Sequence, residues 1–373
     1  MHWLLAPDAY KGCLSAQQVA RAMAAGILRA DPGAQCTLQP MADGGEGTLS
    51  VLQHTLGGRW LRLPAEDLTG RQRQTDCLLL PDGTAVIEVA RIIGLTLAAG
   101  TPLMYRSSRG VGQLIRGCLD AGCRRLILTL GGSGTNDGGA GCLAALGAVW
   151  LDDHGQALDA TPQGLQAVAA VDLSGLDARL AQVPLEVWSD VDNPLLGEQG
   201  ATRVFGRQKG AGAEDGERLE ALLGQLASLA GGSLAERPGS GAAGGLGFAL
   251  QWLGGTLCRG AQAVAERCRL DAALAGADWV VTGEGRTDAQ TLNGKAPLEV
   301  ARRARLAGIP VCLISGGIES HPALSQAFDG LFSLCRGPMT IAYAKANAAT
   351  LISETSEQLA RLVLASARHA PSR

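Results

Sequence analysis

A glycine-rich stretch over residues 129–141 combines backbone freedom with side chains that can bind an anion; it reads Thr-Leu-Gly-Gly-Ser-Gly-Thr-Asn-Asp-Gly-Gly-Ala-Gly. The pattern predicts a buried strand before it, over 125–130, and a short helix after it, over 140–146. Backbone N–H groups of such a loop can turn toward a phosphate, and the helix N-terminus adds positive charge. No lysine follows as in a Walker A loop, so a tight turn that only packs helix on strand stays an alternative. The candidate phosphate-binding residues are Gly131, Gly132, Ser133, Thr135, Asn136 and Asp137.

A second group of candidate ligands is acidic. Asp190 and Asp192, with Asn193, follow a strand predicted in the segment 184–188. Oxygen ligands at this spacing suit Mg²⁺, which usually keeps water and substrate phosphate as further ligands. An acidic turn that caps the next element is the alternative. Three cations follow in a glycine-bounded segment, where a solvated surface is the simplest interpretation: Arg203, Arg207 and Lys209.

Two predicted strands near the N-terminus each end at an acid. The first, over 3–8, ends at Asp8 shortly before Lys11, and the second, over 35–40, is followed by Asp43. Because open α/β sheets bind ligands beyond the carboxyl ends of their strands, both acids are candidates for substrate binding. A simple helix cap is the alternative for each acid.

Arg286, Asp288 and Lys295 lie in a similar arrangement of strand, loop and helix in the last third of the chain. Arginine and lysine side chains here can neutralise a transferring phosphoryl group or hold a substrate carboxylate. The alternative for each cation is a solvated surface position.

The order of predicted elements indicates two domains. About five strands alternate with helices at the two ends of the chain, which predicts a doubly wound parallel sheet built from residues 1–62 and 270–373. Between them, residues 63–269 begin with short strands joined by tight turns, typical of antiparallel pairing, and predict an inserted mixed α/β domain. Apolar spacing of helical type extends over 157–179. We expect the active site in the cleft between the two domains.

Composition excludes several classes of function. The chain has 373 residues with a formal net charge of −3, so it lacks the basic surplus that nucleic-acid binding requires. No segment approaches 18 uncharged apolar residues and the N-terminal apolar run is too short for a signal peptide, so we expect a cytoplasmic protein without membrane contact. Ten scattered cysteines without a C-x-x-C pair are expected to be small buried hydrophobes.

Together, five motifs resemble the bacterial type I glycerate kinase family, in order and across essentially the whole chain. They are Ala-Pro-Asp-Ala-Tyr-Lys-Gly at 6–12, Met-Ala-Asp-Gly-Gly-Glu-Gly at 41–47, Gly-Gly-Ser-Gly-Thr-Asn-Asp-Gly-Gly at 131–139, Ser-Asp-Val-Asp-Asn-Pro at 189–194, and Thr-Gly-Glu-Gly-Arg-Thr-Asp at 282–288 with Asn-Gly-Lys-Ala-Pro at 293–297. The resemblance implies a flavodoxin-like domain with a second domain inserted into it. It also implies ATP-dependent phosphorylation of D-glycerate, usually to 2-phosphoglycerate, with Mg²⁺.

Read with this resemblance, the candidates acquire roles in phosphoryl transfer. Asp190 is the first choice for the base that takes the glycerate proton, before Asp288 and Asp43, and Asp190 or Asp192 would hold Mg²⁺. Cations would neutralise charge or bind the substrate carboxylate. The full prediction is catalytic Asp190, Asp288, Lys295 and Lys11; substrate-binding Asp8, Asp43, Arg286 and Ser107; metal-binding Asp190 and Asp192.

Two other functions stay open at this point. A nucleotide-dependent oxidoreductase of a small hydroxy acid would need a G-x-G-x-x-G turn after the first strand, and residues 8–12 do not form one. A non-catalytic regulator that binds a sugar acid would not need the acids and lysines of these motifs together. We expect D-glycerate and ATP as partners and no nucleic acid, and a homodimer is an open alternative.

Overall fold

The computed structural model describes residues 1–369, without the side chains of Asn293 and His369. The chain forms two compact units. The first contains Met1–Asp43, Ser50–Thr55 and the chain from Gly260 onward, and the second contains Gly44–Leu49 and Leu56–Arg259. The helix α2 (Thr48–Leu56) joins them in sequence. The strand that begins at residue 59 belongs to the second unit, because it pairs along its length with the next strand of that unit.

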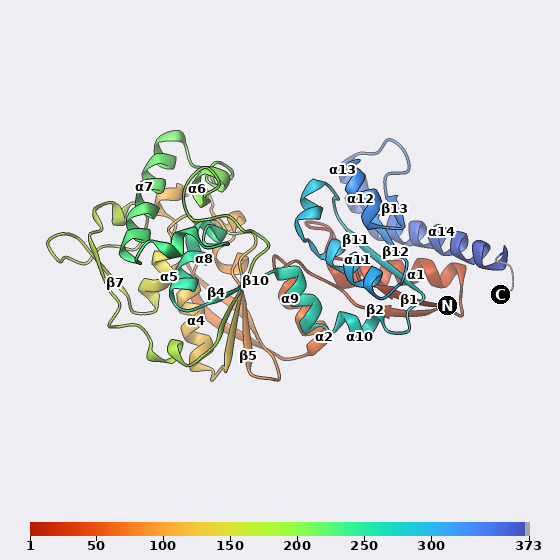
Figure 1. Ribbon diagram of the computed structural model, residues 1–373, viewed down its shortest axis with the longest axis horizontal. Coiled ribbons are helices and arrows are strands. Elements are labelled where there is room, and N and C mark those ends of the chain that lie inside the picture. The colour runs from red at the N-terminus through yellow and green to blue at the C-terminus, as the bar shows by residue number, and fades with distance from the viewer. Residues whose placement is uncertain (370–373) are drawn as a thin grey trace. The chain divides into compact units, whose positions relative to one another are not determined.

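The first unit is built on a five-stranded parallel sheet (Figure 1). Its spatial order is β2-β1-β11-β12-β13, so the first strand of the chain lies inside the sheet between the second strand and the first strand that follows the second unit. This is the strand order of a flavodoxin-like doubly wound sheet, which confirms the predicted fold class. The strands are β1 (His2–Leu5), β2 (Gln35–Leu38), β11 (Trp279–Glu284), β12 (Val311–Ser315) and β13 (Gly330–Ser333).

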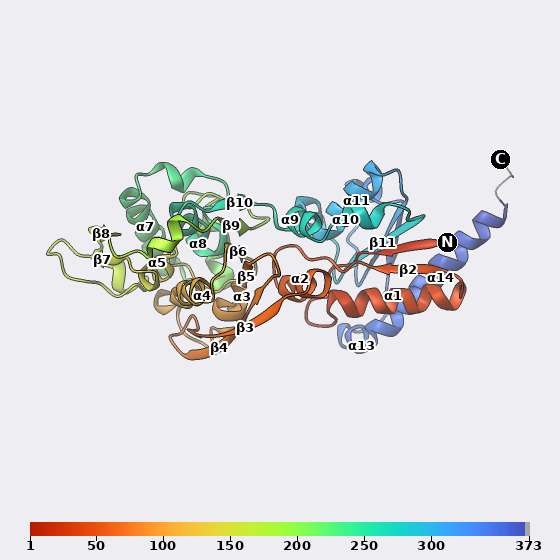
Figure 2. The same cartoon turned by 90° about the horizontal axis from the view of Figure 1, so that it is seen from below.

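Helices cover both faces of this sheet. Figure 2 shows α1 and α14 on one face and α9, α10 and α11 on the other. The core under the first pair contains Trp3, Met23, Ile27, Ile314 and Ile352, all with 3% or less of their surface exposed. The helices are α1 (Ala16–Ala30), α9 (Gly260–Arg267), α10 (Leu270–Leu274), α11 (Ala296–Leu306), α12 (Pro322–Ala327), α13 (Ile341–Ala346) and α14 (Ala348–His369).

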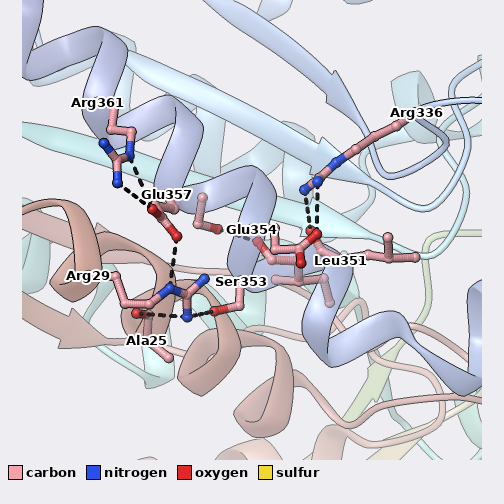
Figure 3. Close-up of polar contacts among 10 residues, drawn as sticks. Ala25, Arg29, Arg336, Leu351, Ser353, Glu354, Glu357 and Arg361 are labelled. Carbon is pink, nitrogen blue, oxygen red and sulfur yellow. Dashed lines mark hydrogen bonds and ion pairs between the residues drawn. The ribbon is translucent and has the colours of Figure 1, made fainter.

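The contact between α1 and α14 is close and is framed by ion pairs (Figure 3). A Cβ atom placed on Gly26 would lie 1.9 Å from the carbonyl oxygen of Ser353, so only glycine lets the two backbones approach this far. Beside it, the Glu357 carboxylate accepts hydrogen bonds from Arg29 on α1 and from Arg361 on its own helix, each at 2.8 Å. The α1–α14 seam therefore depends on one small residue and on a shared carboxylate.

The second unit contains a six-stranded mixed sheet in the order β10-β9-β6-β5-β4-β3. The pairs β3–β4 and β4–β5 are antiparallel, and β5, β6, β9 and β10 are parallel to one another, which confirms a mixed α/β unit. A small antiparallel pair lies apart from it. The strands are β3 (Arg59–Glu66), β4 (Gln72–Leu79), β5 (Thr84–Glu88), β6 (Arg125–Thr129), β9 (Leu185–Trp188) and β10 (Thr256–Cys258), with the pair β7 (Val149–Leu151) and β8 (Ala170–Asp172).

The helical prediction over 157–179 is wrong. That segment holds the short strand β8 between two single 3₁₀ turns, Gly164–Ala167 and Ala178–Ala181. Side-chain oxygens of Asp172 and Asp177 accept backbone N–H groups two residues on, so local turns compete with helix formation there. The helices of the unit are α3 (Ala90–Ile93), α4 (Arg109–Asp120), α5 (Ala140–Ala145), α6 (Ala201–Phe205), α7 (Ala213–Leu229) and α8 (Ala242–Trp252). Across the described residues, every helix is too short or too polar to cross a membrane.

Candidate active site

The predicted ligand loops of the second unit follow neighbouring parallel strands. Thr129, at the end of β6, pairs with Glu88 on β5 and with Trp188 on β9, and the Leu130 N–H donates to the Trp188 carbonyl at 3.0 Å. The chain segments that leave these strands therefore start at the same edge of the sheet. This places the beginnings of the glycine-rich loop and of the Asp190–Asp192 segment at adjacent strand ends, where α/β sheets bind ligands.

Only the first part of the glycine-rich loop faces solvent. Gly132 is exposed, whereas the segment 133–140 is buried. Gly132 has a φ of +74°, and its carbonyl accepts the Leu95 N–H at 3.0 Å. Within the described chain, the N–H groups of Gly131, Gly132 and Ser133 donate to no acceptor. These are the loop donors that remain available for an anion.

Asp137 lies inside the loop with no exposed surface. Its carboxylate accepts the N–H and hydroxyl of Ser108, each at 2.7 Å, and the N–H groups of Gly139 and Gly141 at 3.2 and 3.3 Å. Burial raises the pKa of this carboxyl, whereas these hydrogen bonds lower it. Asp137 thus binds the start of α5 to the segment before α4, and its predicted contact with phosphate stays a prediction.

Thr135 and Asn136 are also fully buried. The Asn136 amide nitrogen donates to Thr202 Oγ1 at 2.9 Å. By contrast, Thr135 Oγ1 and Asn136 Oδ1 are buried oxygens without a hydrogen-bond partner in the part of the chain that the structure describes. A buried polar atom without a partner lowers the free energy of unfolding. These two side chains therefore indicate that the loop is selected for function as well as for stability.

Two buried cations, Lys209 and Arg106, support the loop. The solvated surface expected from the sequence is wrong for Lys209, which is buried under the loop, and Arg106 was not a candidate. The Lys209 Nζ donates to the Thr135 carbonyl at 2.8 Å and to Ser133 Oγ at 3.3 Å. Arg106 donates to the carbonyls of Gly134 and Lys209, at 3.0 and 2.9 Å. Burial lowers the pKa of Lys209 to about 8. A lysine between glycines at 206 and 210 is the one available signal, and it is weak.

The acidic segment after β9 lies closer to the surface. Asp190 is half-buried and Asp192 is exposed. The Asp192 carboxylate pairs with Arg259 at 2.7 Å, and the Asn193 amide donates to the Gln199 carbonyl at 2.7 Å. Among residues 1–369, no three His, Cys, Asp or Glu side chains could hold a metal ion by themselves. Two partly exposed carboxylates fit Mg²⁺ nevertheless, because that ion is commonly held by one or two carboxylates together with substrate phosphates.

In the first unit, a separate group of ionisable residues lies where the strand order reverses. β1 and β11 are neighbours, and Asp8 follows β1 while Glu284 ends β11. The Asp8 N–H donates to the Gly283 carbonyl at 2.8 Å. Burial, and then the nearby Asp43 carboxylate, raise the pKa of Asp8 well above its usual value. This switch point is where flavodoxin-like sheets bind their ligands.

Glu284 is a second residue that was missed as a site candidate, although its motif was noted. Its carboxylate accepts the hydroxyls of Thr291 at 2.6 Å and Thr287 at 3.1 Å, and lies 3.8 Å from the Lys295 Nζ. Burial raises the pKa of Glu284. Its position as the last residue of a buried strand was the available signal.

The other predicted residues of this unit are engaged in ion pairs. Lys11 pairs with Asp43 at 3.3 Å, and Arg286 contacts Glu319 and lies 3.6 Å from Asp288. Asp288 also caps a 3₁₀ turn by accepting a backbone N–H at 2.9 Å. The structure therefore brings Asp8, Glu284 and Lys295 together with their motifs, and leaves Arg286 mostly exposed.

Ser107 belongs to the second unit, just before α4. Its hydroxyl donates to the Ala160 carbonyl at 3.1 Å and accepts the Arg109 N–H at 3.3 Å. The neighbouring Ser108 is the residue that contacts Asp137. The predicted contact of Ser107 with substrate stays a prediction.

Comparison with known proteins decides which family this arrangement represents. The model of the Glycerate kinase family matches residues 3–364. The chain belongs to the glycerate kinase family. A glycerate kinase of Bacillus subtilis strain 168 is 40% identical over 371 residues, covering 96% of this chain and 97% of that protein. A glycerate 2-kinase of Escherichia coli K12 is 36% identical over 380 residues, covering 99% and 100%.

A solved structure supports the same membership at the level of the fold. A crystal structure from Salmonella typhimurium LT2, provisionally named glycerate kinase 2, superposes with a TM-score of 0.86 at 40% identity and covers 99% of both chains. The family resemblance stated from the five motifs is therefore confirmed. For this glycerate kinase family member, the motifs at the two sheet edges are the places to look for substrate contacts.

Proposed function

We propose that this protein transfers the γ-phosphoryl group of ATP to D-glycerate and forms 2-phosphoglycerate. The observation that carries the proposal is the exposed start of the glycine-rich loop. There, the N–H groups of Gly131, Gly132 and Ser133 have no partner in the described chain, next to the strand end that leads to Asp190. Free N–H donors beside carboxylates suit a phosphate chain and its cation.

The proposed mechanism assigns positioning and charge neutralisation to this chain. The three loop N–H groups bind phosphate oxygens of ATP. Asp190 and Asp192 would hold Mg²⁺, which neutralises phosphate charge when bound. Asp190 takes the proton from the 2-hydroxyl of glycerate. If Asp190 instead binds the metal ion, Asp192 is the base. Asp288 and Asp43 are the next candidates for the base.

The first unit would supply the groups that recognise the substrate. Lys11, Lys295 and Arg286 are positive groups that can bind the glycerate carboxylate or the transferring phosphoryl group. Asp8 and Asp43 can accept hydrogen bonds from the glycerate hydroxyls. Ser107, in the second unit, is a further candidate for a substrate contact. Lys295 is the best placed cation, because Glu284 lies beside it and its side chain is only 25% exposed.

The test is an ADP-release assay with ATP, Mg²⁺ and D-glycerate, with the position of the product phosphate read by ³¹P NMR. We expect glycerate-dependent ADP and a 2-phospho product. ADP release that does not depend on glycerate would reject glycerate as the acceptor, and a 3-phospho product would reject the regiochemistry alone. Lys295→Ala should lower kcat/KM with little loss of stability. An unchanged kcat/KM would show that Lys295 is a surface residue without a role in turnover.

We also propose that the protein works in the cytoplasm. Among residues 1–369, none of the ten cysteines forms a disulfide, which is typical of a reducing compartment. A homodimer is retained as a proposal that sedimentation or light scattering of the purified chain would test.

A further inference from the structure

A hollow of about 560 Å³ opens beside the exposed start of the glycine-rich loop, within the second unit. It lies at the carboxyl ends of the parallel pair β5 and β6, and Gly132 forms part of its wall. The start of α3 and the segment Leu95–Leu97 also line it. Sites for small organic ligands have volumes of about 300–1,000 Å³, so the hollow is large enough for one.

The wall of the hollow and the loop are held as one piece. The Leu95 N–H donates to the Gly132 carbonyl at 3.0 Å, and the Gly134 N–H donates to the Ile93 carbonyl at 2.7 Å. A Cβ on Gly134 would lie 2.9 Å from Leu95 Cα, so the two segments are in close backbone contact. A molecule bound to the free N–H groups of the loop would therefore lie beside this wall.

The hollow offers apolar surface on one side. Leu95 and Leu97 line it with Ala90, and Leu95 has 38% of its surface exposed. Leu97 is half-buried, so the exposed side chain of Leu95 provides most of this surface. An exposed leucine in a concave place suits a flat apolar group better than it suits water. D-Glycerate has only three carbons, each bearing oxygen, and offers no such surface.

Arg91 adds a cation to the lining of the same hollow. Its Nε is buried, forms an ion pair with the Glu88 carboxylate at 3.6 Å, and has no hydrogen-bond partner among the described residues. The guanidinium carbon lies 5.8 Å from the centre of the Trp60 ring, so the side chain is fixed from two sides. The exposed Glu46 carboxylate lies at the rim and can accept hydrogen bonds from hydroxyl groups.

We propose that this hollow binds the nucleoside part of the phosphate donor, with the base against Leu95 and Leu97 and the sugar hydroxyls near Glu46. The proposal rests on the proposed function, because it places the phosphates on the adjacent loop. A purine nucleoside has apolar faces, polar edges and two vicinal hydroxyls. The hollow provides apolar, cationic and acidic groups, and it lies next to the N–H donors of the glycine-rich loop.

Calorimetric titration of the full chain with ADP and with inorganic tripolyphosphate separates the nucleoside site from the phosphate site. Thr96→Trp fills the hollow from an exposed position, and Leu95→Asp makes its apolar wall acidic. We expect each variant to weaken ADP binding about tenfold or more, or by about 1.4 kcal/mol, and to leave tripolyphosphate binding unchanged. Thr350→Trp, at an exposed threonine of α14 in the first unit, is the matched control and should change neither.

Each outcome decides the proposal. Unchanged ADP affinity in Thr96→Trp and Leu95→Asp would overturn it, and so would an equal loss of ADP and tripolyphosphate binding, since the hollow would then hold phosphate. A wild-type chain that binds neither compound would overturn both this proposal and the proposed function. Selective loss of ADP binding in a chain that does not phosphorylate glycerate would support the nucleoside site and reject the acceptor alone.

Discussion

The ammonium nitrogen of Lys209 lies 2.8 Å from the carbonyl oxygen of Thr135, in the buried interior of the second unit. Arg106 holds the preceding carbonyl, that of Gly134, at 3.0 Å. Two successive carbonyls of the glycine-rich loop are therefore fixed by positive side chains from behind. Each fixed carbonyl holds the peptide plane that it shares with the next residue, so the part of the loop directly after the donors at 131–133 is held in place, and the two positive charges favour an anion nearby.

Replacing Lys209 by Met should damage this support without removing a group that touches substrate. We expect the KM for ATP to rise about tenfold, because the Thr135 carbonyl loses its donor and the loop loses a nearby positive charge. Lys209→Arg keeps the charge and should recover part of the affinity. Steady-state kinetics of both variants check this, and an unchanged KM for ATP in Lys209→Met would show that the loop holds its shape unaided.

The lowered pKa of Lys209 predicts a dependence of stability on pH. Its pKa is about 8 in the folded chain and 10.5 in its ordinary state, so between these values the unfolded chain binds more protons. Stability should then rise with pH relative to Lys209→Met, by about 2 kcal/mol between pH 8 and 10. Urea unfolding of both proteins at the two pH values measures the difference. A constant difference would show that Lys209 titrates normally. The affinity for ATP should fall over the same range, as the charge is lost.

Asp8→Asn should make the protein more stable and less active at neutral pH. Burial and the nearby Asp43 raise the pKa of Asp8, so above its ordinary value of 3.8 the folded chain holds the proton more strongly than the unfolded chain. Stability is therefore lost as the pH rises toward the folded pKa, and an amide avoids that loss. We expect a higher Tm for the variant at pH 8 and a smaller gain at pH 4. Equal gains at both pH values would contradict this account.

The roles of Asp190 and Asp192 can be separated by their amides. Asp190→Asn should lower kcat by about 10²–10⁴-fold, the range expected for loss of a general base, while ADP still binds. Asp192→Asn should mainly raise the Mg²⁺ concentration needed for half-maximal rate. Turnover measured across a magnesium series distinguishes the two, and the reverse pattern would exchange the assignments.

Gly26→Ala should destabilise the first unit through backbone contact. The new methyl group would lie 1.9 Å from the Ser353 carbonyl, so α1 and α14 must move apart, at a cost of about 1–3 kcal/mol. Gly224→Ala is the matched control, since a Cβ there, within α7, meets nothing within 4 Å. That change should stabilise by about 0.5–1 kcal/mol. Thermal unfolding of both variants is the measurement, and a Gly26→Ala chain as stable as the wild type would show that the helix seam can adjust.

Many strands could be predicted from the sequence because their signals are local. The run at 125–130 is rich in leucine and isoleucine and contains β6, and the acids that follow such runs mark the carboxyl edges of both sheets. The helix predicted over 157–179 is absent because turns capped by aspartate form there in place of a helix, although the apolar spacing is helical.

The buried charges of the site could not be predicted in the same way. The neighbours of Lys209 in the sequence are polar and typical of a surface. Lys209 is buried because the fold packs it against a loop that precedes it by more than 70 residues in the sequence. Glu284 gains its importance from hydroxyls of Thr287 and Thr291, which fold back over it. Such contacts depend on tertiary structure, and a single sequence carries no record of them.

The position of β1 between β2 and β11 has a consequence for synthesis on the ribosome. The first strand and helix emerge early, but β11 and α14, against which they pack, emerge only after the whole second unit has been made. The second unit can complete its own sheet during that interval, because all of its strands are already present. Nascent α1 then waits with its apolar side uncovered, which makes the early N-terminal segment the part of this chain that a chaperone would bind.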